Sequence, residues 1–324
     1  MDSASYKQIT TSRSYMYSYY RSAHKGPKQA IVLLHGFPEY SDMWAEPVKA
    51  LEALGYNCIV PDLLGYGASS KPVEAEAYNS EGLSQDIADL LDSEGIDKAI
   101  VIGHDWGSYL AGRFANWQPS RIIGLVLTSV AYQPSAKLEL EKANARLKAT
   151  IGYEPFGYWT WIASAEAPRT LHDHAESFFS LLYAQNADIW KTEFTPTGKL
   201  QDWLHHDRTV EGAKFITPEI KARTIQKWKE EGFDGKLGWY RAMTENAHWN
   251  HEQNLAPENF RLDIPVLFIG GLRDAPAPAA LGDLVTKPLC HDYTGKVIDS
   301  GHWMLREKPE EWLETVKIWL EAKF

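Results

Sequence analysis

Short apolar runs alternate along the chain with stretches in which apolar residues recur at helical spacing. The apolar runs are rich in Val and Ile, are bounded by Gly, Pro or Asp, and span residues 30–34, 57–61, 99–103, 123–127, 265–270 and 295–299. Such runs are typical of strands buried on both faces. Between them, residues 43–55 and 82–95 favour amphipathic helices. This alternation predicts an α/β fold with a mostly parallel, doubly wound sheet.

The two ends of the chain add one element each to this pattern. Tyr15, Tyr17 and Tyr19 alternate with other residues near the start, which predicts a half-exposed antiparallel strand at an edge of the sheet. Residues 309–324 favour an amphipathic helix that closes the fold.

Residues 133–250 interrupt the alternation, because they contain no clear buried strand. They carry more than half of the chain's 13 tryptophans, whereas a linker would be poor in aromatic residues. We therefore expect a packed helical cap at 133–250, inserted into one α/β core that is formed by residues 1–132 and 251–324.

Charge and hydropathy narrow the possible partners. The 324-residue chain has a net charge of −10, which argues against nucleic-acid binding because that needs a basic patch. No apolar run approaches the ~20 residues of a membrane helix, and the N-terminus lacks an apolar signal core. We expect a cytoplasmic protein without a membrane span, in which Cys58 and Cys290 are free thiols.

The apolar run that ends at Gly103 leads into a turn with the frame Gly-x-Asp-x-Gly, formed by Gly103, Asp105 and Gly107. A strand, a sharp turn and a helix with flanking glycines are typical of a nucleophile elbow. Such an elbow raises its central side chain at the carboxyl ends of the strands, where ligands bind in open α/β folds. The alternative interpretation of Asp105 is a helix cap.

Five motifs together favour the nucleophile, because they resemble the α/β-hydrolase fold and, more narrowly, its epoxide hydrolase branch. They are HGFPE at 35–39, DLLGYGASSKP at 62–72, GHDWGS at 103–108, GLRDAP at 271–276 and DSGHW at 299–303. The resemblance covers essentially the whole chain and is greatest to the shorter plant and microbial members, which lack a phosphatase domain. It implies hydrolysis of a small apolar epoxide by water, with no metal and no other cofactor. The natural epoxide, the selectivity and the oligomeric state, monomer or homodimer, stay open.

An aspartate at the elbow suits alkyl transfer. Its unperturbed pKa of ~3.9 leaves it ionised at neutral pH, so it can attack an epoxide carbon without a base and form an alkyl ester. Water must then hydrolyse this ester, and the family's chain order of nucleophile, acid and histidine implies His302 as the base and Asp274 as the residue that orients it. Residues 127–132, where some relatives carry the acid, contain no carboxylate.

Further residues are implied around this triad. The backbone N–H groups of Phe37 and Trp106 are expected to form an oxyanion hole for the Asp105 carbonyl oxygen. Substrate-binding positions are expected at His35, Pro38, His104, Phe156 and Trp303, with a cis bond before Pro38. Of these, we interpret His35 as shaping the oxyanion loop and His104 as lying behind the nucleophile.

The resemblance also implies two cap tyrosines that donate hydrogen bonds to the epoxide oxygen. The segment PFGYWTW maps the first to Tyr158, and GKLGWYRAM maps the second to Tyr240. Tyr153 lies close by and is the alternative for the first position. For all three, packing with a solvated hydroxyl is the competing interpretation.

Two other functions compete with epoxide hydrolysis. A haloalkane dehalogenase shares the aspartate nucleophile, and Trp106 would suit its halide site, but Phe37 stands where dehalogenases typically have Asn. A non-enzymatic ligand receptor on the same fold is the other alternative, against which the intact triad weighs. The histidines of HWNHE, residues 248–252, do not form the His-Glu-x-x-His metal frame.

Overall fold

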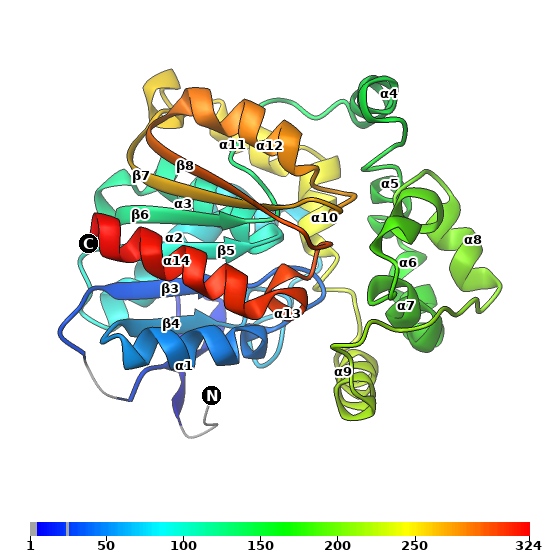
Figure 1. The fold of residues 1–324 in the computed structure, drawn as a ribbon, viewed down its shortest axis with the longest axis horizontal. Coiled ribbons are helices and arrows are strands. Elements are labelled where there is room, and N and C mark those ends of the chain that lie inside the picture. Colours follow the sequence, from blue (N-terminus) through cyan, green and yellow to red (C-terminus); the bar gives the residue numbers. More distant parts are fainter. Residues whose placement is uncertain (1–4, 24–25) are drawn as a thin grey trace.

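The computed structural model describes residues 5–23 and 26–324, which build one eight-stranded sheet (Figure 1). Its strands are β1 (Tyr6–Thr10), β2 (Met16–Arg21), β3 (Ala30–Leu34), β4 (Asn57–Pro61), β5 (Ala99–His104), β6 (Ile122–Thr128), β7 (Leu262–Gly271) and β8 (Cys290–Ile298). Their order is β1-β2-β4-β3-β5-β6-β7-β8. Strands β3 to β8 run parallel, and β1 and β2 pair antiparallel to their neighbours.

Helices cover both faces of this sheet, because successive strand side chains point to opposite faces. The core helices are α1 (Ala45–Ala53), α2 (Ser80–Ser93), α3 (Trp106–Trp117), α12 (Ala279–Thr286), α13 (Met304–Glu307) and α14 (Pro309–Lys323). On β3, Ile31 and Leu33 pack in a cluster with α1 and α14, whereas Val32 and Leu34 pack in the cluster that contains α2 and α3. The predicted doubly wound α/β class is thereby confirmed.

The six apolar runs of the sequence correspond to the six parallel strands, with β7 and β8 longer than predicted. The prediction for the tyrosine strand is wrong in two respects. Strand β2 is antiparallel as expected, but β1 lies outside it and forms the edge. Tyr17, Tyr19 and Tyr20 are all buried, because residues of α2 cover Tyr17 and Tyr19 on one face of the sheet and residues of α1 cover Tyr20 on the other.

Residues 129–261, between β6 and β7, contain helices and loops and no strand. Their helices are α4 (Leu140–Ile151), α5 (Trp159–Ile162), α6 (Ala167–Asp173), α7 (Ala175–Leu182), α8 (Lys199–His205), α9 (Pro218–Glu231), α10 (Gly238–Thr244) and α11 (Ala247–Glu252). Figure 1 shows α4 to α9 as a separate layer beyond the carboxyl ends of the parallel strands. Helices α10 and α11 return to the core and contact the turn at Ala75–Tyr78, and α11 also contacts α2.

The remaining helical segments are short. They are the 3-10 turns Ser41–Trp44, Ala75–Tyr78, Pro119–Arg121, Ala187–Ile189, Pro257–Phe260 and Lys287–Leu289, and a π-helical turn at Trp190–Phe194. Across residues 5–23 and 26–324, none of the helices has the length and apolar character that a bilayer crossing requires. The division of the chain at residues 132 and 250 stays a prediction, and α11 spans the second of these limits.

Candidate active site

Asp105 lies on a strained turn between β5 and α3. Its φ of 54° and ψ of −123° belong to a region that side chains other than glycine rarely adopt. A Cβ atom at Gly103 would collide with the carbonyl of Gly107, and one at Gly107 would collide with the carbonyl of Leu34. Both glycines of the sequence frame are therefore required by the close backbone packing of the elbow.

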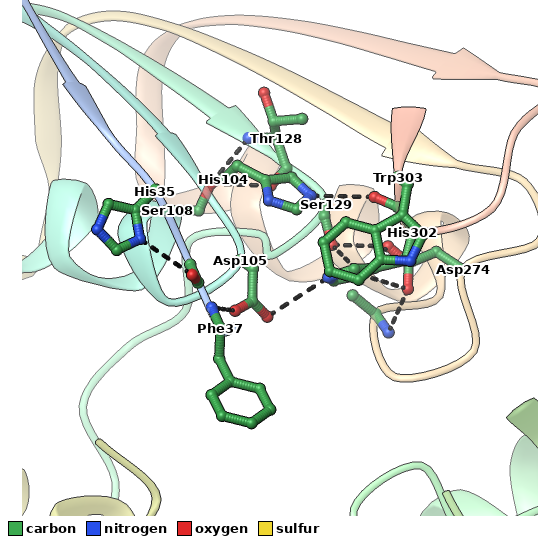
Figure 2. Close-up of polar contacts among 12 residues, drawn as sticks. His35, Phe37, His104, Asp105, Ser108, Thr128, Ser129, Asp274, His302 and Trp303 are labelled. Atoms are coloured by element: carbon green, nitrogen blue, oxygen red, sulfur yellow. Dashed lines mark hydrogen bonds and ion pairs between the residues drawn. The ribbon is translucent and has the colours of Figure 1, made fainter. Parts of the chain in front are cut away.

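The Asp105 carboxylate is held at one of its two oxygens. The backbone N–H of Phe37 donates to Asp105 Oδ1 at 2.8 Å (Figure 2), and the Phe37–Pro38 peptide is cis as expected. Burial raises the pKa of Asp105, although His302 and the backbone N–H groups of Trp106 and Phe37 act in the opposite direction. Both predicted oxyanion donors thus face this carboxylate.

His302 lies between two carboxylates. Its Nε2 is 3.7 Å from Asp105 Oδ2, and its Nδ1 is 3.2 and 3.1 Å from the two oxygens of Asp274. Burial alone lowers the pKa of His302, but Asp274 and Asp105 outweigh it, and the net direction is upward. The loops after β5, β7 and β8 therefore bring together the three residues that the sequence places in a triad (Figure 2).

Ser129 is a member of this cluster that the sequence analysis missed. Its hydroxyl donates to Asp274 Oδ2 at 2.6 Å and lies 3.1 Å from His302 Nδ1. The residue directly follows β6 and has a φ of 73°. The sequence signal for Ser129 is its place in residues 127–132, the segment in which some relatives carry the acid.

His35 and His104 are held by main-chain groups of the site. His35 Nδ1 is 3.0 Å from the Gly36 carbonyl, and its Nε2 accepts from the Leu63 N–H at 2.9 Å. His104 Nε2 is 3.0 Å from the His302 carbonyl, and burial lowers the pKa of His104 to about 3. Both rings are fully buried and bond to the main chain, which agrees with the interpretation that His35 shapes the oxyanion loop and His104 lies behind the nucleophile.

A cavity of about 220 Å³ opens beside Asp105. Its wall is mainly apolar, and it is formed by Asp105, Trp106, Tyr109, Ser129, Val130, Ala131, Gln133, Leu147, Pro155, Phe156, Tyr158, Trp159, Met243, Pro276, Ala277, Pro278, Leu281, Gly282 and Val285. The predicted residues Phe156 and Tyr158 thus share the cavity with the predicted nucleophile. Apolar walls with few polar groups are typical of sites for small ligands.

The structure separates the candidate tyrosines. The Tyr153 hydroxyl donates to the Ala275 carbonyl at 2.8 Å, whereas Tyr158 lines the cavity. The ring centroid of Tyr240 lies 5.9 Å from that of Tyr158 and 5.2 Å from that of Trp106. This arrangement favours Tyr158 over Tyr153 as the partner of Tyr240.

Comparison with known proteins agrees with this geometry. Residues 29–309 match the family described as the alpha/beta hydrolase fold. Over 292 residues the chain is 30% identical to epoxide hydrolase A of Mycobacterium tuberculosis, and the matched region covers 87% of each protein. The chain belongs to the epoxide hydrolase family.

Other members of the epoxide hydrolase family are similar over nearly all of this chain. It is 27% identical over 305 residues to bifunctional epoxide hydrolase 2 of Sus scrofa, a match that covers 92% of the chain but only 52% of that relative, so the chain spans about half its length. The crystal structure of epoxide hydrolase A from Mycobacterium thermoresistibile superposes with a TM-score of 0.79 at 26% identity, covering 98% of both chains.

In this epoxide hydrolase family member a second cavity, of about 480 Å³, lies on the His302 side of the site. Its lining comprises Leu182, Ala184, Gln185, Ala187, Trp190, Ala213, Lys214, Phe215, Arg273, His302, Trp303, Arg306, Glu307 and Lys308. Trp303, predicted as a substrate-binding residue, belongs to this second wall. Pro38 lines neither of these two cavities, and its carbonyl accepts a hydrogen bond from the Trp228 indole at 3.3 Å.

Proposed function

We propose that the protein hydrolyses small apolar epoxides to vicinal diols through a covalent ester on Asp105. The observation that carries this proposal is the unequal environment of the two carboxylate oxygens. Oδ1 accepts the Phe37 N–H at 2.8 Å, while Oδ2 faces His302 at 3.7 Å, beyond hydrogen-bond distance. Oδ2 therefore remains available to attack carbon, and Oδ1 becomes the carbonyl oxygen of the ester.

In the first step, Asp105 Oδ2 attacks a ring carbon, and the bond from that carbon to the epoxide oxygen breaks. Tyr158 and Tyr240 of the proposed cap, residues 133–250, donate to this oxygen and one supplies its proton. Burial and then the Asp105 charge raise the pKa of Tyr158. Burial, Tyr158 and Asp105 raise the pKa of Tyr240, so both hydroxyls keep their protons until the ring opens.

In the second step, neutral His302 takes a proton from water, and the resulting hydroxide attacks the ester carbonyl carbon. Negative charge then develops on Oδ1, where the N–H groups of Phe37 and Trp106 stabilise it, each by ~3–4 kcal/mol in comparable sites. Collapse of this intermediate releases the diol oxygen, which takes the proton from His302, and the proton left on the regenerated Asp105 carboxyl group returns through solvent to the tyrosinate formed in the first step. Asp274 and Ser129 hold the imidazole at Nδ1 throughout.

The test of this mechanism is to stop it after the first step. The variant His302→Gln keeps a polar side chain of similar size but has no base, so it should form the ester and then stall. Mass spectrometry after addition of an aryl epoxide should find protein plus substrate on the peptide that contains Asp105. The variant His248→Gln, which changes a buried histidine outside the site, should turn over without accumulating the ester. An unmodified Asp105 in His302→Gln with full residual turnover would refute the mechanism.

A second test separates epoxide opening from dehalogenation, because a halide leaves without a proton. Tyr158→Phe and Tyr240→Phe should each slow alkylation by an aryl epoxide on the order of 10²–10³-fold, and the double variant should nearly abolish it. Tyr153→Phe is the matched control, since that hydroxyl bonds to Ala275. If the double variant opened the ring at close to the unmodified rate, or if halide release were the faster activity, the proposal would fail.

A further inference from the structure

Two cap side chains reach the loop that carries the oxyanion donor Phe37. The fully buried indole of Trp228, near the end of α9, donates through Nε1 to the carbonyl of Pro38 at 3.3 Å. Pro38 directly follows Phe37, so this bond anchors the peptide next to the donating N–H. The Phe37 ring also packs against cap rings, with centroid distances of 6.5 Å to Phe233 and 5.2 Å to Tyr240.

The second side chain is Lys236, whose ammonium group is completely buried between α9 and α10. It donates to Glu231 Oε2 at 3.1 Å and to the Gly232 carbonyl at 2.8 Å. It also lies 5.4 and 5.6 Å from the ring centroids of Tyr40 and Tyr66. Burying a charge costs free energy unless the charge is paired. The buried ammonium group of Lys236 therefore needs its pairing with Glu231, and the catalytic steps above do not use this residue.

The Tyr40 and Tyr66 rings beside Lys236 lie next to His35, which is in the same loop as Phe37. The His35 ring lies 6.5 Å from Tyr40 and 4.7 Å from Tyr66, measured between centroids. His35 bonds in turn to the carbonyl of Gly36, the residue before Phe37. Trp228 therefore bonds directly to the residue after Phe37, whereas Lys236 is linked to the residue before it only through packed rings and His35.

We propose that Trp228 and Lys236 are positioning residues that hold the Phe37 N–H on Asp105 Oδ1 and thereby set the rate of ester hydrolysis. The inference rests on the proposed function, because it concerns the ester of Asp105. During hydrolysis negative charge grows on Oδ1, so the donor is worth more in the transition state than before it. During alkylation the carboxylate loses charge, so a displaced donor does not slow this step.

The experiment measures the two steps separately in single turnovers of an aryl epoxide. Trp228→Phe deletes one hydrogen bond and keeps an aromatic ring, and Lys236→Met deletes the charge and keeps the chain. In each, hydrolysis should slow by about 10-fold, a fraction of the 10²–10³-fold seen when such a donor is removed. Alkylation should stay close to the unmodified rate, so the ester should accumulate.

The matched control is Trp203→Phe. Its indole is also buried and also donates at 3.3 Å, but to the Ser177 carbonyl within the cap, so both rates should be unchanged. Lys236→Arg keeps the positive charge and should recover part of the hydrolysis rate. Thermal unfolding of all variants reports any general loss of stability, and if Lys236→Met fails to fold, Trp228→Phe decides.

The pH profile gives a readout that a merely structural role would not change. Burial lowers the pKa of Lys236 to about 8, against the opposing effect of Glu231. The other charged groups that face it are Lys71 and Lys227, and burial raises the pKa of Tyr40 and Tyr66, which stay neutral. Hydrolysis should therefore decline above about pH 8 in the unmodified protein but not in Lys236→Met.

Equal slowing of both steps in Trp228→Phe, or a hydrolysis rate that is unchanged, would overturn the inference. These outcomes differ from failure of the proposed function, in which no ester on Asp105 would form in any variant, including His302→Gln.

Discussion

Two clusters along α3 each combine a buried histidine with a carboxylate, and only one has the properties of a reactive site. The first lies at the start of the helix, where His302 stands between Asp105 and Asp274. The second lies one to two turns later, where His248 and Glu252 of α11 meet Arg113. In both clusters the histidine is buried against a buried carboxylate, Asp274 in the first and Glu252 in the second, whereas Asp105 is partly exposed.

They differ in which polar group lacks a partner and in whether that group borders a cavity. Glu252 Oε1 accepts from Arg113 Nε at 2.8 Å, from the Tyr109 hydroxyl at 3.1 Å and from the Ser80 hydroxyl at 2.7 Å. Within the described part of the chain His248 has no hydrogen-bond partner at either ring nitrogen, and burial lowers its pKa to about 4. Asp105, by contrast, turns one oxygen toward His302 at the wall of a cavity. A reactive site needs a hydrogen-bond acceptor that lacks a donor and borders a cavity. Burial and composition alone do not provide such an acceptor.

The largest expected effect is a loss of activity when the Asp105 cluster is changed. Asp105→Asn should remove the nucleophile and lower kcat by on the order of 10⁴–10⁶-fold. Because burial raises the pKa of Asp105 and so disfavours its charge, the neutral side chain should leave the melting temperature unchanged or higher. Initial rates and thermal melts of the variant check both. A marked loss of stability would show that Asp105 supports the fold as Glu252 does.

Asp274→Asn should change the hydrogen-bonding pattern at His302 Nδ1 and slow ester hydrolysis by on the order of 10²–10⁴-fold, as loss of the orienting carboxylate does in other triads. Alkylation should be spared, because Asp105 attacks without a base. Pre-steady-state traces separate the two rates. Slowing of alkylation alone would show that Asp274 acts on the nucleophile rather than on the histidine.

Glu252→Gln should act on stability instead. It leaves the Arg113 guanidinium buried without its counterion, which costs about 3–5 kcal/mol of unfolding free energy, while kcat per folded molecule should change little. Glu139→Gln, in the exposed pair with Lys142, is the control and should cost less than about 1 kcal/mol. Denaturant unfolding measures both. A 10²-fold loss of kcat with unchanged stability in Glu252→Gln would assign the second cluster to the site.

The smallest effect is a difference in pH dependence between the two histidines. The pKa of His302 is raised above 6.5, so its contribution to stability is complete below that value and is lost as pH rises through the folded pKa. The pKa of His248 is lowered from 6.5 to about 4. Between these values the unfolded chain binds more protons at this residue, so stability falls as pH falls through that window.

His248→Phe should therefore reduce the loss of stability between pH 6.5 and 4, which denaturant unfolding across that range measures. The acid limb of ester hydrolysis should follow His302, whose pKa Asp274 still raises when Asp105 is esterified, and should stay where it is in this variant. An acid limb that moved with His248→Phe would mean that the second histidine takes part in the reaction.

Most of the core was predictable because it depends on local sterics and on burial. Parallel strands covered on both faces must be continuously apolar, and the six runs in the sequence correspond to β3 to β8. The elbow was predictable for a similar reason, since Gly103 and Gly107 stand where a Cβ atom would collide with backbone. Strand β1, with the sequence YKQIT, has no such pattern, because an edge strand exposes much of its length.

The order of the strands and loops, and with it the set of residues that meet at the carboxyl ends of the sheet, follows from local patterns in the sequence. The hydrogen-bond partners of individual polar groups at that edge follow only from the packing of the folded chain. This packing turned the Tyr153 hydroxyl to Ala275, brought Ser129 to Asp274, and placed Trp228 on Pro38 across 190 positions of chain. Each of these is a single hydrogen bond between distant segments, which depends on placement to within a few tenths of an ångström and leaves no periodic signature in the sequence.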